Sequence, residues 1–275
     1  MTLKAGVIGW PIAHSRSPLI HNHWARVHGI DAHYERIPVA PEDADRFFAT
    51  FAEQDYVGAN VTIPYKEHAF RAAARHDPVA ERLQAVNCLW IEGGQVCGAN
   101  TDAEGFLGNL DASAPGWDRN PGAALVLGAG GAARAVVDGL VARGFTVRIA
   151  NRTLARAEEL AGRYPGHATA HAFADADRLL ADAVVVVNTT SLGMKGEGDI
   201  DLDLARLGPE TVVTDIVYVP LKTPFLQRAE AAGLRTVDGL GMLLHQAVPA
   251  FERWFGVRPT VTPELRALVE ADLKP

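Results

Sequence analysis

Ala123-Ala124-Leu125-Val126-Leu127-Gly128-Ala129-Gly130-Gly131-Ala132-Ala133 is the stretch that decides the fold of this 275-residue chain. The run Ala123–Leu127 is apolar throughout, which is typical of a strand buried on both faces of a sheet. Gly128–Ala133 then fits the pattern G-x-G-x-x-A of a strand-to-helix turn that holds the pyrophosphate of a dinucleotide. Such glycines let phosphate approach the backbone, and the unpaired N–H groups of the helix attract its negative charge. A glycine-rich turn without a ligand is the alternative, but the flanking strand and helix favour a nucleotide.

On both sides of this turn, short apolar runs alternate with amphipathic stretches, which predicts an α/β fold. Gly144 ends the helix that begins at the turn, and Thr223-Pro224 and Gly233 mark the start and the stop of a later helix. Uninterrupted Val, Ile and Leu strands between helices indicate a parallel sheet with both faces covered. We expect strands at Phe145–Ala150, Ala183–Val187 and Val212–Ile216, and helices through Ala142 and over Thr153–Arg163.

The N-terminal third shows the same alternation, and the C-terminal end is helical. Pro249 lies inside the first C-terminal helix, so we expect a kink or a break there. The expected N-terminal strands are Lys4–Ile8, His33–Pro38, Ala59–Ile63 and parts of Leu89–Cys97, and the expected helices are Pro18–His28, Ala44–Glu53 and Ala103–Leu110. The expected C-terminal helices are Gly239–Phe255 and Pro263–Leu273.

Composition and length exclude several classes of protein. Hydrophobic residues make up 48% and charged residues 21%, which excludes disordered, collagen-like and coiled-coil chains. At about 150 residues per domain, the length predicts two domains. The formal net charge of -7 argues against a nucleic-acid partner. No run reaches the roughly 18 apolar residues of a membrane span, and the start has no signal-peptide core. We therefore expect a cytoplasmic protein with no membrane partner.

The two cysteines are too few for a disulfide framework. Cys88 and Cys97 flank the turn Glu92-Gly93-Gly94, so a hairpin could set them nearly opposite each other, and a cross-strand disulfide is geometrically conceivable. A cytoplasmic setting favours free, buried thiols instead. We expect no metal site, because the histidines of the N-terminal segment are scattered: His14, His21, His23 and His28.

The strand after the glycine-rich turn indicates which nucleotide binds. An NAD site usually has Asp or Glu about 20 residues beyond the turn, to hold the ribose 2′-OH. Here that place is Asn151-Arg152-Thr153, with Arg156 one helical turn later. A guanidinium binds a 2′-phosphate with two parallel hydrogen bonds, whereas a carboxylate repels it. Solvated arginines with a helix cap from Thr153 are the alternative, and the pattern favours NADP.

Two polar clusters of the N-terminal third fit a small substrate. Pro18 favours an extended conformation at Ser17, which would point Ser15 and Ser17 the same way and Arg16 the other. Two hydroxyls on one face can bind a small carboxylate or a polyol, and helix capping is the alternative. In Asn60–Lys66 a strand ends at a proline that can start a helix. Lys66 would then lie in the first turn, where the helix dipole disfavours a positive charge, as suits a lysine that exchanges protons.

A third cluster, Asn100-Thr101-Asp102, precedes a helix, and helix capping is the alternative for Asp102. With the other clusters it completes a set of motifs through which the chain resembles the shikimate/quinate dehydrogenase family, in the same order from about residue 6 to about residue 256. Cys88 stands where the family more often has Thr. The motifs are Gly9-x-Pro11-Ile12-x-His14-Ser15-x-Ser17-Pro18, Asn60-Val61-Thr62-x-Pro64-x-Lys66, Ala85-Val86-Asn87, Asn100-Thr101-Asp102, Gly128–Ala132, Asn151-Arg152-Thr153, Asn188-x-Thr190-Ser191-x-Gly193-Met194, Asp215-x-x-Tyr218-x-Pro220 and Asp238-Gly239-Leu240-Gly241-Met242-Leu243-x-x-Gln246.

The resemblance implies an oxidoreductase that reduces 3-dehydroshikimate to shikimate, reversibly and with NADPH, in aromatic amino-acid biosynthesis. It implies an active site between an α/β substrate domain and a Rossmann-type, doubly wound NADP domain. Lys66 and Asp102 would be the catalytic pair. The implied substrate-binding residues are Ser15, Ser17, Thr62, Lys66, Asn87, Asp102, Tyr218 and Gln246, and the implied cofactor-binding residues are Gly128, Ala129, Gly130, Gly131, Ala132, Asn151, Arg152, Thr153, Arg156, Thr190, Gly239 and Met242.

The implied domains are residues 1–102 plus 238–275 for the substrate and 103–237 for NADP, in a monomer or a homodimer. The nearest alternative is a quinate/shikimate dehydrogenase with relaxed use of NAD and NADP, against which Ser17 and Arg152 argue. A methylene-tetrahydrofolate dehydrogenase is less compatible, because the serine pair has no evident use with a folate. A non-catalytic NADP-binding regulator is the alternative from another class, and the presence of Lys66 and Asp102 argues against it.

Overall fold

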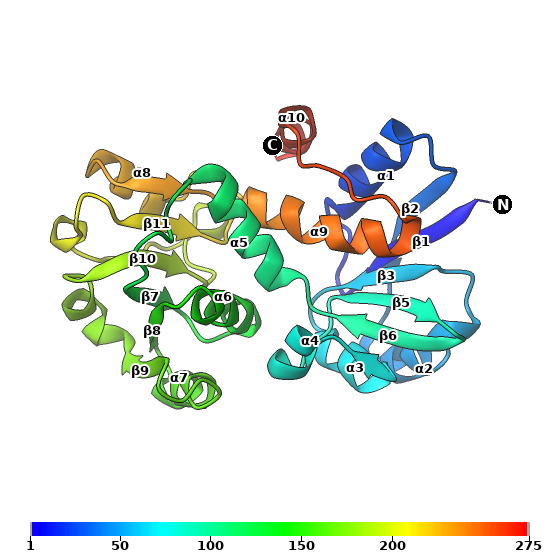
Figure 1. Ribbon diagram of the computed structural model, residues 1–275, viewed down its shortest axis with the longest axis horizontal. Helices are drawn as coiled ribbons and strands as arrows, with labels where there is room; N and C mark the ends of the chain where they lie inside the picture. Colours follow the sequence, from blue (N-terminus) through cyan, green and yellow to red (C-terminus); the bar gives the residue numbers. More distant parts are fainter. Residues whose placement is uncertain (1, 274–275) are drawn as a thin grey trace. The chain divides into compact units, whose positions relative to one another are not determined.

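The computed structural model describes residues 2–273 (Figure 1). The chain divides into two compact units, one of residues 2–101 with 246–273 and the other of residues 102–245. Among the described residues, no helix is both long enough and apolar enough to cross a membrane.

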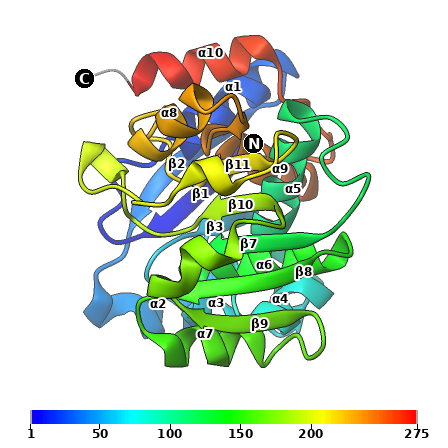
Figure 2. The same ribbon diagram turned by 90° about the vertical axis from the view of Figure 1, so that its left-hand side faces the viewer.

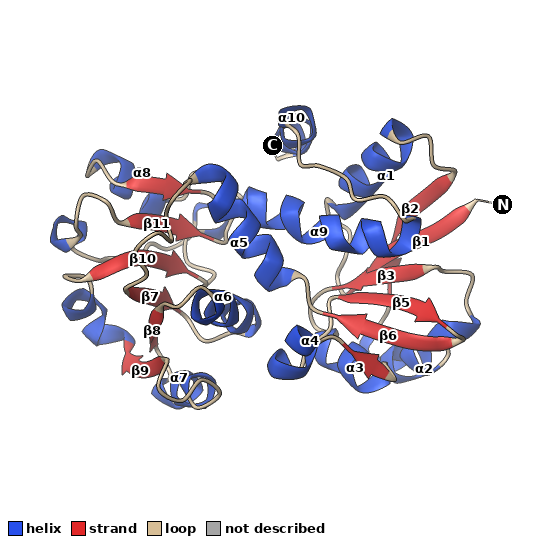
Figure 3. Ribbon diagram, viewed as in Figure 1, coloured by secondary structure: helices blue, strands red, loops and turns tan. Residues whose placement is uncertain are grey.

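The first unit contains a mixed six-stranded sheet (Figure 3). Its strands lie in the order β2-β1-β3-β5-β6-β4. The first three are parallel to one another, and the hairpin of β5 and β6 begins with a strand antiparallel to β3. The bounds are Leu3–Gly9 for β1, Ala32–Pro38 for β2, Gly58–Val61 for β3, Arg75–His76 for β4, Cys88–Glu92 for β5 and Gln95–Ala99 for β6.

Helices cover both faces of this sheet. One face packs its apolar side chains, with Ile8, Ile37 and Leu89 among them, against α2, α3 and α4. On the other face, α1 and the second half of α9 enclose an aromatic cluster that includes Tyr34 and Trp254. The bounds are Ser17–Val27 for α1, Ala44–Ala49 for α2, Lys66–Ala72 for α3, Pro78–Leu83 for α4, Leu240–Phe255 for α9 and Pro263–Asp272 for α10, with 3-10 turns at Pro41–Asp43 (η1) and Phe51–Glu53 (η2).

The second unit contains a six-stranded sheet in which every pair of strands is parallel (Figure 2). The strand order is β12-β11-β10-β7-β8-β9. This is the doubly wound Rossmann order, which reverses direction between β7 and β10. The bounds are Ala123–Leu127 for β7, Thr146–Asn151 for β8, Ala168–Ala172 for β9, Ala183–Asn188 for β10, Val212–Asp215 for β11 and Arg235–Val237 for β12. The predicted parallel sheet is confirmed.

Alternate residues of the β7 strand point into two separate cores. Ala124 and Val126 pack with the helices α5, α6 and α7, whereas Leu125 and Leu127 pack with α8 and the 3-10 segment η3. Both faces of the sheet are therefore covered, which explains the continuous apolar run. The helix bounds are Asp102–Ser113 for α5, Gly131–Ala142 for α6, Leu154–Ala161 for α7 and Pro224–Ala231 for α8, and the 3-10 segments are Phe173–Leu179 (η3), Met194–Gly196 (η4) and Leu204–Arg206 (η5).

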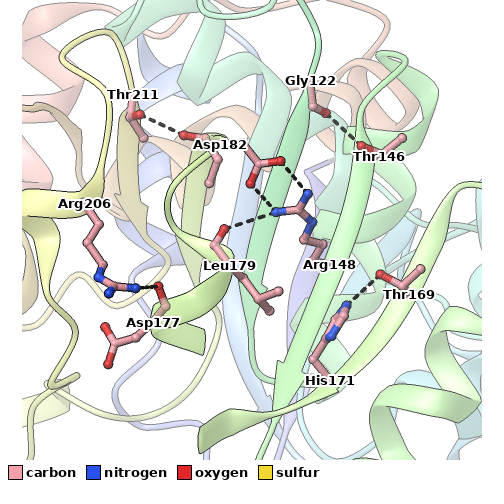
Figure 4. A network of polar contacts seen from close by, with 11 residues as sticks. Gly122, Thr146, Arg148, Thr169, His171, Asp177, Leu179, Asp182, Arg206 and Thr211 are labelled. Atoms are coloured by element: carbon pink, nitrogen blue, oxygen red, sulfur yellow. Dashed lines mark hydrogen bonds and ion pairs between the residues drawn. The ribbon is translucent and has the colours of Figure 1, made fainter. Parts of the chain in front are cut away.

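A network of polar contacts ties the segments at the amino-terminal ends of these strands together (Figure 4). Arg148 of β8 donates from Nη2 to Asp182 Oδ2 at 2.6 Å and from Nη1 to the Leu179 carbonyl at 3.3 Å. The hydrogen bond from Arg148 lowers the pKa of Asp182. Thr211 closes the network on the next strand by donating to the Ala183 carbonyl at 2.9 Å. These contacts join η3 to the sheet and leave the carboxyl ends of the strands for a ligand.

Several local predictions were wrong. Pro249 does not break α9, which runs through it, because buried Ala247, Ala250 and Phe251 hold the helix against the loss of about 3 kcal/mol that an internal proline costs. The segment predicted as one helix over Ala44–Glu53 is a short α-helix followed by a separate 3-10 turn. The strand predicted over Ala59–Ile63 ends at Val61. The elements β4, β9, β12 and α4 were not predicted from the sequence.

Both cysteines are free and buried, as expected. In the hairpin, Cys97 lies opposite Trp90 and Cys88 opposite Ala99, so the two cysteines do not face each other. Burial raises the pKa of the Cys88 thiol to about 12.

We expect Cys88 to remain unmodified by a thiol-specific disulfide reagent near pH 8, because the thiolate is the reactive form and burial suppresses it. Titration of the native protein, followed by titration in denaturant without reductant, measures this. Rapid modification of Cys88 in the native protein would contradict it, as would the absence of titratable thiols after unfolding.

His21 makes the stability of the first unit depend on pH. Its fully buried ring stacks on Tyr34 with 4.2 Å between ring centroids, and burial lowers the His21 pKa from 6.5 to about 3, partly offset by the Asn60 side chain. Below pH 6.5 the unfolded chain therefore binds a proton that the folded chain excludes. We expect the free energy of unfolding to fall with decreasing pH from 6.5 towards 3, by up to about 1.4 kcal/mol per pH unit.

Urea unfolding at several pH values, with His21→Phe as the variant, measures this contribution. The variant keeps an aromatic ring in the stack. Its free energy of unfolding should depend less on pH between 6.5 and 3 than that of the wild type, whatever its stability at neutral pH. His33→Gln, at an exposed position of β2, is the control and should retain it. Equal slopes for the wild type and His21→Phe would rule out His21 as the source.

Candidate active site

The glycine-rich turn joins β7 to α6 and requires glycine for two different reasons. Gly128 has a φ of 107°, and a Cβ there would lie 2.7 Å from Thr189 Oγ1, so a side chain would be strained and would collide. At Gly130 and Gly131 an added Cβ would meet nothing within 4 Å. The start of α6 is therefore open to a ligand, and the amino terminus of a helix attracts phosphate.

A cavity of about 300 Å³ lies beside this turn. Three of its side chains are arginines and one, Glu159, is a carboxylate that pairs with Arg163 at 3.4 Å, so the cavity suits an anionic ligand. Of these three arginines, Arg156 was predicted from the sequence to bind the cofactor, whereas Arg134 and Arg163 were not. The full lining is Ala129, Gly130, Gly131, Arg134, Arg156, Glu159, Leu160 and Arg163.

The segment Arg152-Thr153 follows β8 and is exposed. In the sequence it comes shortly before Arg156, which lines the cavity. Asn151 donates from Nδ2 to the Thr153 carbonyl at 2.8 Å and so shapes the turn. Arg152 and Thr153 are exposed, and neither lines the cavity. Thr153 precedes α7 but makes no side-chain capping bond to it, so capping does not explain this residue.

A buried carboxylate, Asp215, organises the carboxyl ends of β10 and β11. It accepts hydrogen bonds from Asn188 Nδ2 at 2.9 Å, from Thr223 Oγ1 at 2.7 Å and from the Val217 amide at 2.9 Å. Burial raises the pKa of Asp215, and these three bonds oppose that shift. Asn188 Oδ1 in turn accepts from the Thr190 hydroxyl at 2.7 Å. The predicted cofactor residue Thr190 is thus fixed at the switch point of the sheet, by residues that were given no role from the sequence.

The last predicted cofactor residues precede and begin α9. At Gly239 an added Cβ would lie 2.4 Å from the Ile216 carbonyl oxygen, so only glycine allows the two backbones to approach. Asn109 of α5 donates to the Asp238 carbonyl at 2.6 Å and holds the same turn. Met242 is half-buried against the apolar core of the second unit, and Tyr218 is half-buried after β11.

Ser15 and Ser17 do not lie on an extended segment, so that prediction was wrong. Arg16 has helical angles (φ -94°, ψ -5°), and Ser17 is the first residue of α1, with Pro18 in the first helical turn where a missing N–H costs little. The Ser17 amide donates to Ser15 Oγ at 3.3 Å, so the two serines are still close. Arg36 of β2 donates to the Ser15 carbonyl at 2.7 Å and holds the loop.

Thr62 and Lys66 follow β3, and Lys66 is the first residue of α3, as predicted. Thr62 continues the pairing of β3, because its amide donates to the Ile8 carbonyl at 2.9 Å. The Lys66 carbonyl accepts from the Val86 amide at 2.9 Å, which connects this helix to the segment carrying Asn87. Both Thr62 and Lys66 are half-buried.

Asn87 is buried and joins three segments of the first unit. It donates from Nδ2 to Thr101 Oγ1 at 3.0 Å, and its Oδ1 accepts from the Thr101 amide at 2.8 Å. The Thr101 hydroxyl lies 2.9 Å from the Gln246 carbonyl, to which it donates. The fold thus connects Asn87 with Gln246, which lie far apart in the sequence. Asp102 follows Thr101 in the sequence and is the first residue of α5.

A larger cavity, of about 750 Å³, lies in the first unit at the amino-terminal ends of β1 and β3. This is the opposite end of those strands from Thr62 and Lys66. Arg253 lies over the Trp90 ring, 4.7 Å from its centroid, and both residues line this cavity. Volume alone therefore does not identify the candidate site. Within residues 2–273, no cluster of three or more His, Cys, Asp or Glu residues is suited to a metal ion.

Comparisons with known proteins agree with this geometry. The profile "Shikimate dehydrogenase substrate binding domain" matches residues 7–89, "Shikimate / quinate 5-dehydrogenase" matches 118–194 and "Shikimate 5'-dehydrogenase C-terminal domain" matches 239–263. Shikimate dehydrogenase (NADP(+)) of Azorhizobium caulinodans is 58% identical over 271 residues, which cover 98% of this chain and 96% of the relative.

Two solved structures extend the comparison. Shikimate 5-dehydrogenase of Thermus thermophilus, in complex with NADP(H) and shikimate, superposes with a TM-score of 0.87 at 34% identity, covering 99% of this chain and 100% of that one. Quinate dehydrogenase of Corynebacterium glutamicum, in complex with NAD, superposes with a TM-score of 0.89 at 28% identity. The match covers 98% of this chain and 99% of that one. With a relative 58% identical over nearly its whole length and this fold, the chain belongs to the shikimate/quinate dehydrogenase family.

Proposed function

We propose that this chain catalyses the reversible reduction of 3-dehydroshikimate to shikimate. It is an oxidoreductase of the shikimate pathway, in aromatic amino-acid biosynthesis, and its coenzyme is NADP⁺. One observation in this chain of the family carries the proposal. Lys66 is the first residue of α3 and Asp102 is the first residue of α5, and each follows directly after a predicted substrate-binding segment.

Lys66 supplies the proton in this proposal. NADPH, when bound, supplies the hydride. As the carbonyl carbon of the substrate accepts it, negative charge develops on the oxygen, which must be protonated as it forms. The Lys66 ammonium donates that proton, and Asp102 holds the ammonium. In the reverse direction the Lys66 amine takes the proton from the hydroxyl of shikimate.

The remaining predicted residues hold the substrate. Ser15 and Ser17 bind its carboxylate, which their mutual contact at the start of α1 supports. Tyr218 lines the site. The ring hydroxyls bind to Thr62, Asn87, Asp102 and Gln246, and the connection of Asn87 through Thr101 to Gln246 supports part of that set.

The open start of α6 and its arginine-lined cavity fit a phosphorylated dinucleotide. We assign the pyrophosphate to Gly128–Ala132, and the 2′-phosphate and its ribose to Asn151, Arg152, Thr153 and Arg156. Thr190, Gly239 and Met242 would bind the nicotinamide half. We assign substrate binding to residues 1–102 with 238–275 and NADP binding to residues 103–237. The division into two compact units supports this assignment except at residue 102 and residues 238–245, which belong to the second unit. We place the reaction in the cytoplasm, where thiols such as those of Cys88 and Cys97 remain reduced.

Quinate oxidation with NAD⁺ is the second candidate function, because the quinate dehydrogenase of Corynebacterium glutamicum superposes with a TM-score of 0.89. Steady-state turnover of shikimate and of quinate, each with NADP⁺ and with NAD⁺, tests both functions. We expect the highest kcat/KM for shikimate with NADP⁺. A preference for quinate with NAD⁺ would establish the second candidate, and no turnover in any of the four reactions would refute both.

A further inference from the structure

Thr190 lies just beyond β10, beside the glycine-rich turn of the second unit. A Cβ added at Gly128 would come within 3.1 Å of the Thr190 methyl carbon, and the amide of Thr189 donates to the Leu127 carbonyl at 2.8 Å. Thr190 is half-buried, so part of the residue is accessible to a ligand at this turn. Whether its hydroxyl offers that ligand a proton or a lone pair depends on the hydrogen bonds that it already makes.

The side-chain amide of Asn188 has one orientation that satisfies its neighbours. The backbone amide of Thr190 lies 2.9 Å from one end of this group, and because a backbone N–H always donates, that end must be the oxygen, Oδ1. The other end is therefore the nitrogen, Nδ2. It donates to the Leu192 carbonyl at 3.2 Å and to Asp215 Oδ1 at 2.9 Å, so both of its protons are used.

Asp215 holds this orientation from the far side. Its Oδ1 also accepts from the Val217 amide at 2.9 Å, and its Oδ2 accepts from the Thr223 hydroxyl at 2.7 Å. The Val217 N–H makes Asp215 Oδ1 an acceptor, and Asp215 is fully buried. A flipped Asn188 would therefore bring two acceptor oxygens together inside the protein, at a large cost in free energy.

The proton of the Thr190 hydroxyl is consequently committed to the protein. Asn188 Oδ1 carries no proton, so the Thr190 hydroxyl must donate to it, at 2.7 Å. Thr190 Oγ1 also accepts from the Leu192 amide at 3.1 Å. What remains on this oxygen is a single lone pair, and a lone pair can bind only a hydrogen-bond donor.

We propose that Asp215, acting through Asn188, is a positioning residue that keeps Thr190 as a hydrogen-bond acceptor for the nicotinamide half of the coenzyme. The inference rests on the proposed function, in which Thr190 binds that half. The pyrophosphate, whose oxygens only accept, is not the partner of Thr190, although the glycine-rich turn is adjacent. The nicotinamide half of NADP⁺ has two kinds of donor, the carboxamide N–H and the hydroxyls of its ribose.

Binding of NADP⁺ to the full chain, measured by isothermal titration calorimetry without substrate, tests the acceptor. Thr190→Val keeps the shape of the side chain and removes the lone pair, so Kd should rise about fivefold, as expected for the loss of one hydrogen bond. Thr190→Ser keeps the hydroxyl and should bind NADP⁺ within about twofold of the wild type. Thr211→Val is the matched control: Thr211 is a buried threonine of the same unit that donates to the Ala183 carbonyl at 2.9 Å, and Kd should not change.

Two further ligands identify what Thr190 contacts. Adenosine 2′,5′-bisphosphate lacks the nicotinamide half, so its Kd should be the same in Thr190→Val and in the wild type. The 3-acetylpyridine analogue of NADP⁺ has a methyl group in place of the carboxamide nitrogen. If the carboxamide is the donor, Thr190→Val should not weaken this analogue. If a ribose hydroxyl is the donor, the analogue should be weakened as much as NADP⁺, with the bisphosphate still unaffected.

Asp215→Ala and Asp215→Asn test the positioning. Asp215→Ala leaves Asn188 free to turn, and the coenzyme must then order Thr190 on binding, so Kd for NADP⁺ should rise about fivefold. Asp215→Asn keeps an oxygen for Val217 and Asn188 and should restore Kd to within about twofold of the wild type. In the Thr190→Val background, Asp215→Ala should add nothing, because the group that it positions is gone.

If Asp215→Ala does not fold, Asn188→Ala removes the same connection and keeps the buried carboxylate. It should raise Kd for NADP⁺ and lose that effect in the Thr190→Val background. An unchanged Kd for NADP⁺ in Thr190→Val would overturn the inference, as would an equal rise in Kd for adenosine 2′,5′-bisphosphate. The same rise from Asp215→Ala with and without Thr190 would remove the positioning role of Asp215.

Failure of the proposed function would look different from these results. The wild type would then bind NADP⁺ without oxidising shikimate, and the Kd measurements, which involve no turnover, would still decide the inference.

Discussion

Lys66→Ala is expected to reduce kcat for shikimate oxidation by about 10²–10⁴-fold, the usual contribution of a general acid or base. Lys66 is the first residue of α3, and its side chain is half-buried, so the fold fixes its position while leaving it within reach of a ligand. KM for shikimate should change little, because the serines, Thr62 and Asn87 supply the binding. Steady-state kinetics at saturating NADP⁺, with circular dichroism to confirm folding, measures the effect.

Lys222→Ala is the matched control for the loss of a lysine. Lys222 donates to Glu230 at 2.9 Å on the surface of the second unit, and its removal should leave kcat unchanged. A near wild-type kcat in Lys66→Ala would remove Lys66 from the catalytic role. A large rise in KM with unchanged kcat would make Lys66 a binding residue instead.

Arg152→Ala is expected to raise KM for NADP⁺ by about 10–100-fold, which corresponds to the 1.5–3 kcal/mol of hydrogen bonds to a charged group. KM for NAD⁺ should stay nearly constant, because NAD⁺ has no 2′-phosphate. Arg152 lies in the turn after β8, where the chain has arginine instead of the acidic residue of an NAD site. Kinetics with both coenzymes, at saturating shikimate, measures the ratio.

Arg156→Ala tests whether the two arginines share the phosphate, since Arg156 lines the cavity and Arg152 does not. Arg206→Ala is the control: Arg206 is an exposed arginine of the same unit that donates to the Asp177 carbonyl at 3.2 Å, and neither coenzyme should be affected by its loss. Equal losses for NADP⁺ and NAD⁺ in Arg152→Ala would refute the assignment of the 2′-phosphate.

The sequence predicted the second unit better than the first. Ala123–Leu127 was predicted residue for residue, because a strand buried on both faces has to be apolar throughout. The strand Ala168–Ala172 was missed, because alanine-rich segments have low strand propensity and only pairing with β8 makes this one a strand. A break at Pro249 does not occur, because burial of its helix, which periodicity does not measure, outweighs the missing hydrogen bond.

The candidate site was predicted as a set of residues but not as a network. Motif order identified Asn87 and Gln246, yet nothing in their spacing predicted that Thr101 joins them. The role of Asp215 could not be predicted either. The sequence shows only an aspartate at the end of a strand, and does not show that its carboxylate is buried and accepts three hydrogen bonds. Such partners come from segments that only the folded chain brings together.

The place of β2 at one end of the first sheet has a consequence for the behaviour of the protein in concentrated solution. The strand β2 is an edge strand, paired only with β1, and edge strands present free N–H and C=O groups on which a strand from another molecule can add. At Tyr34 both of these groups are already occupied by the Asn22 amide, which imitates a neighbouring strand. A single side chain thus protects the middle of this edge against the intermolecular sheet growth that leads to aggregation.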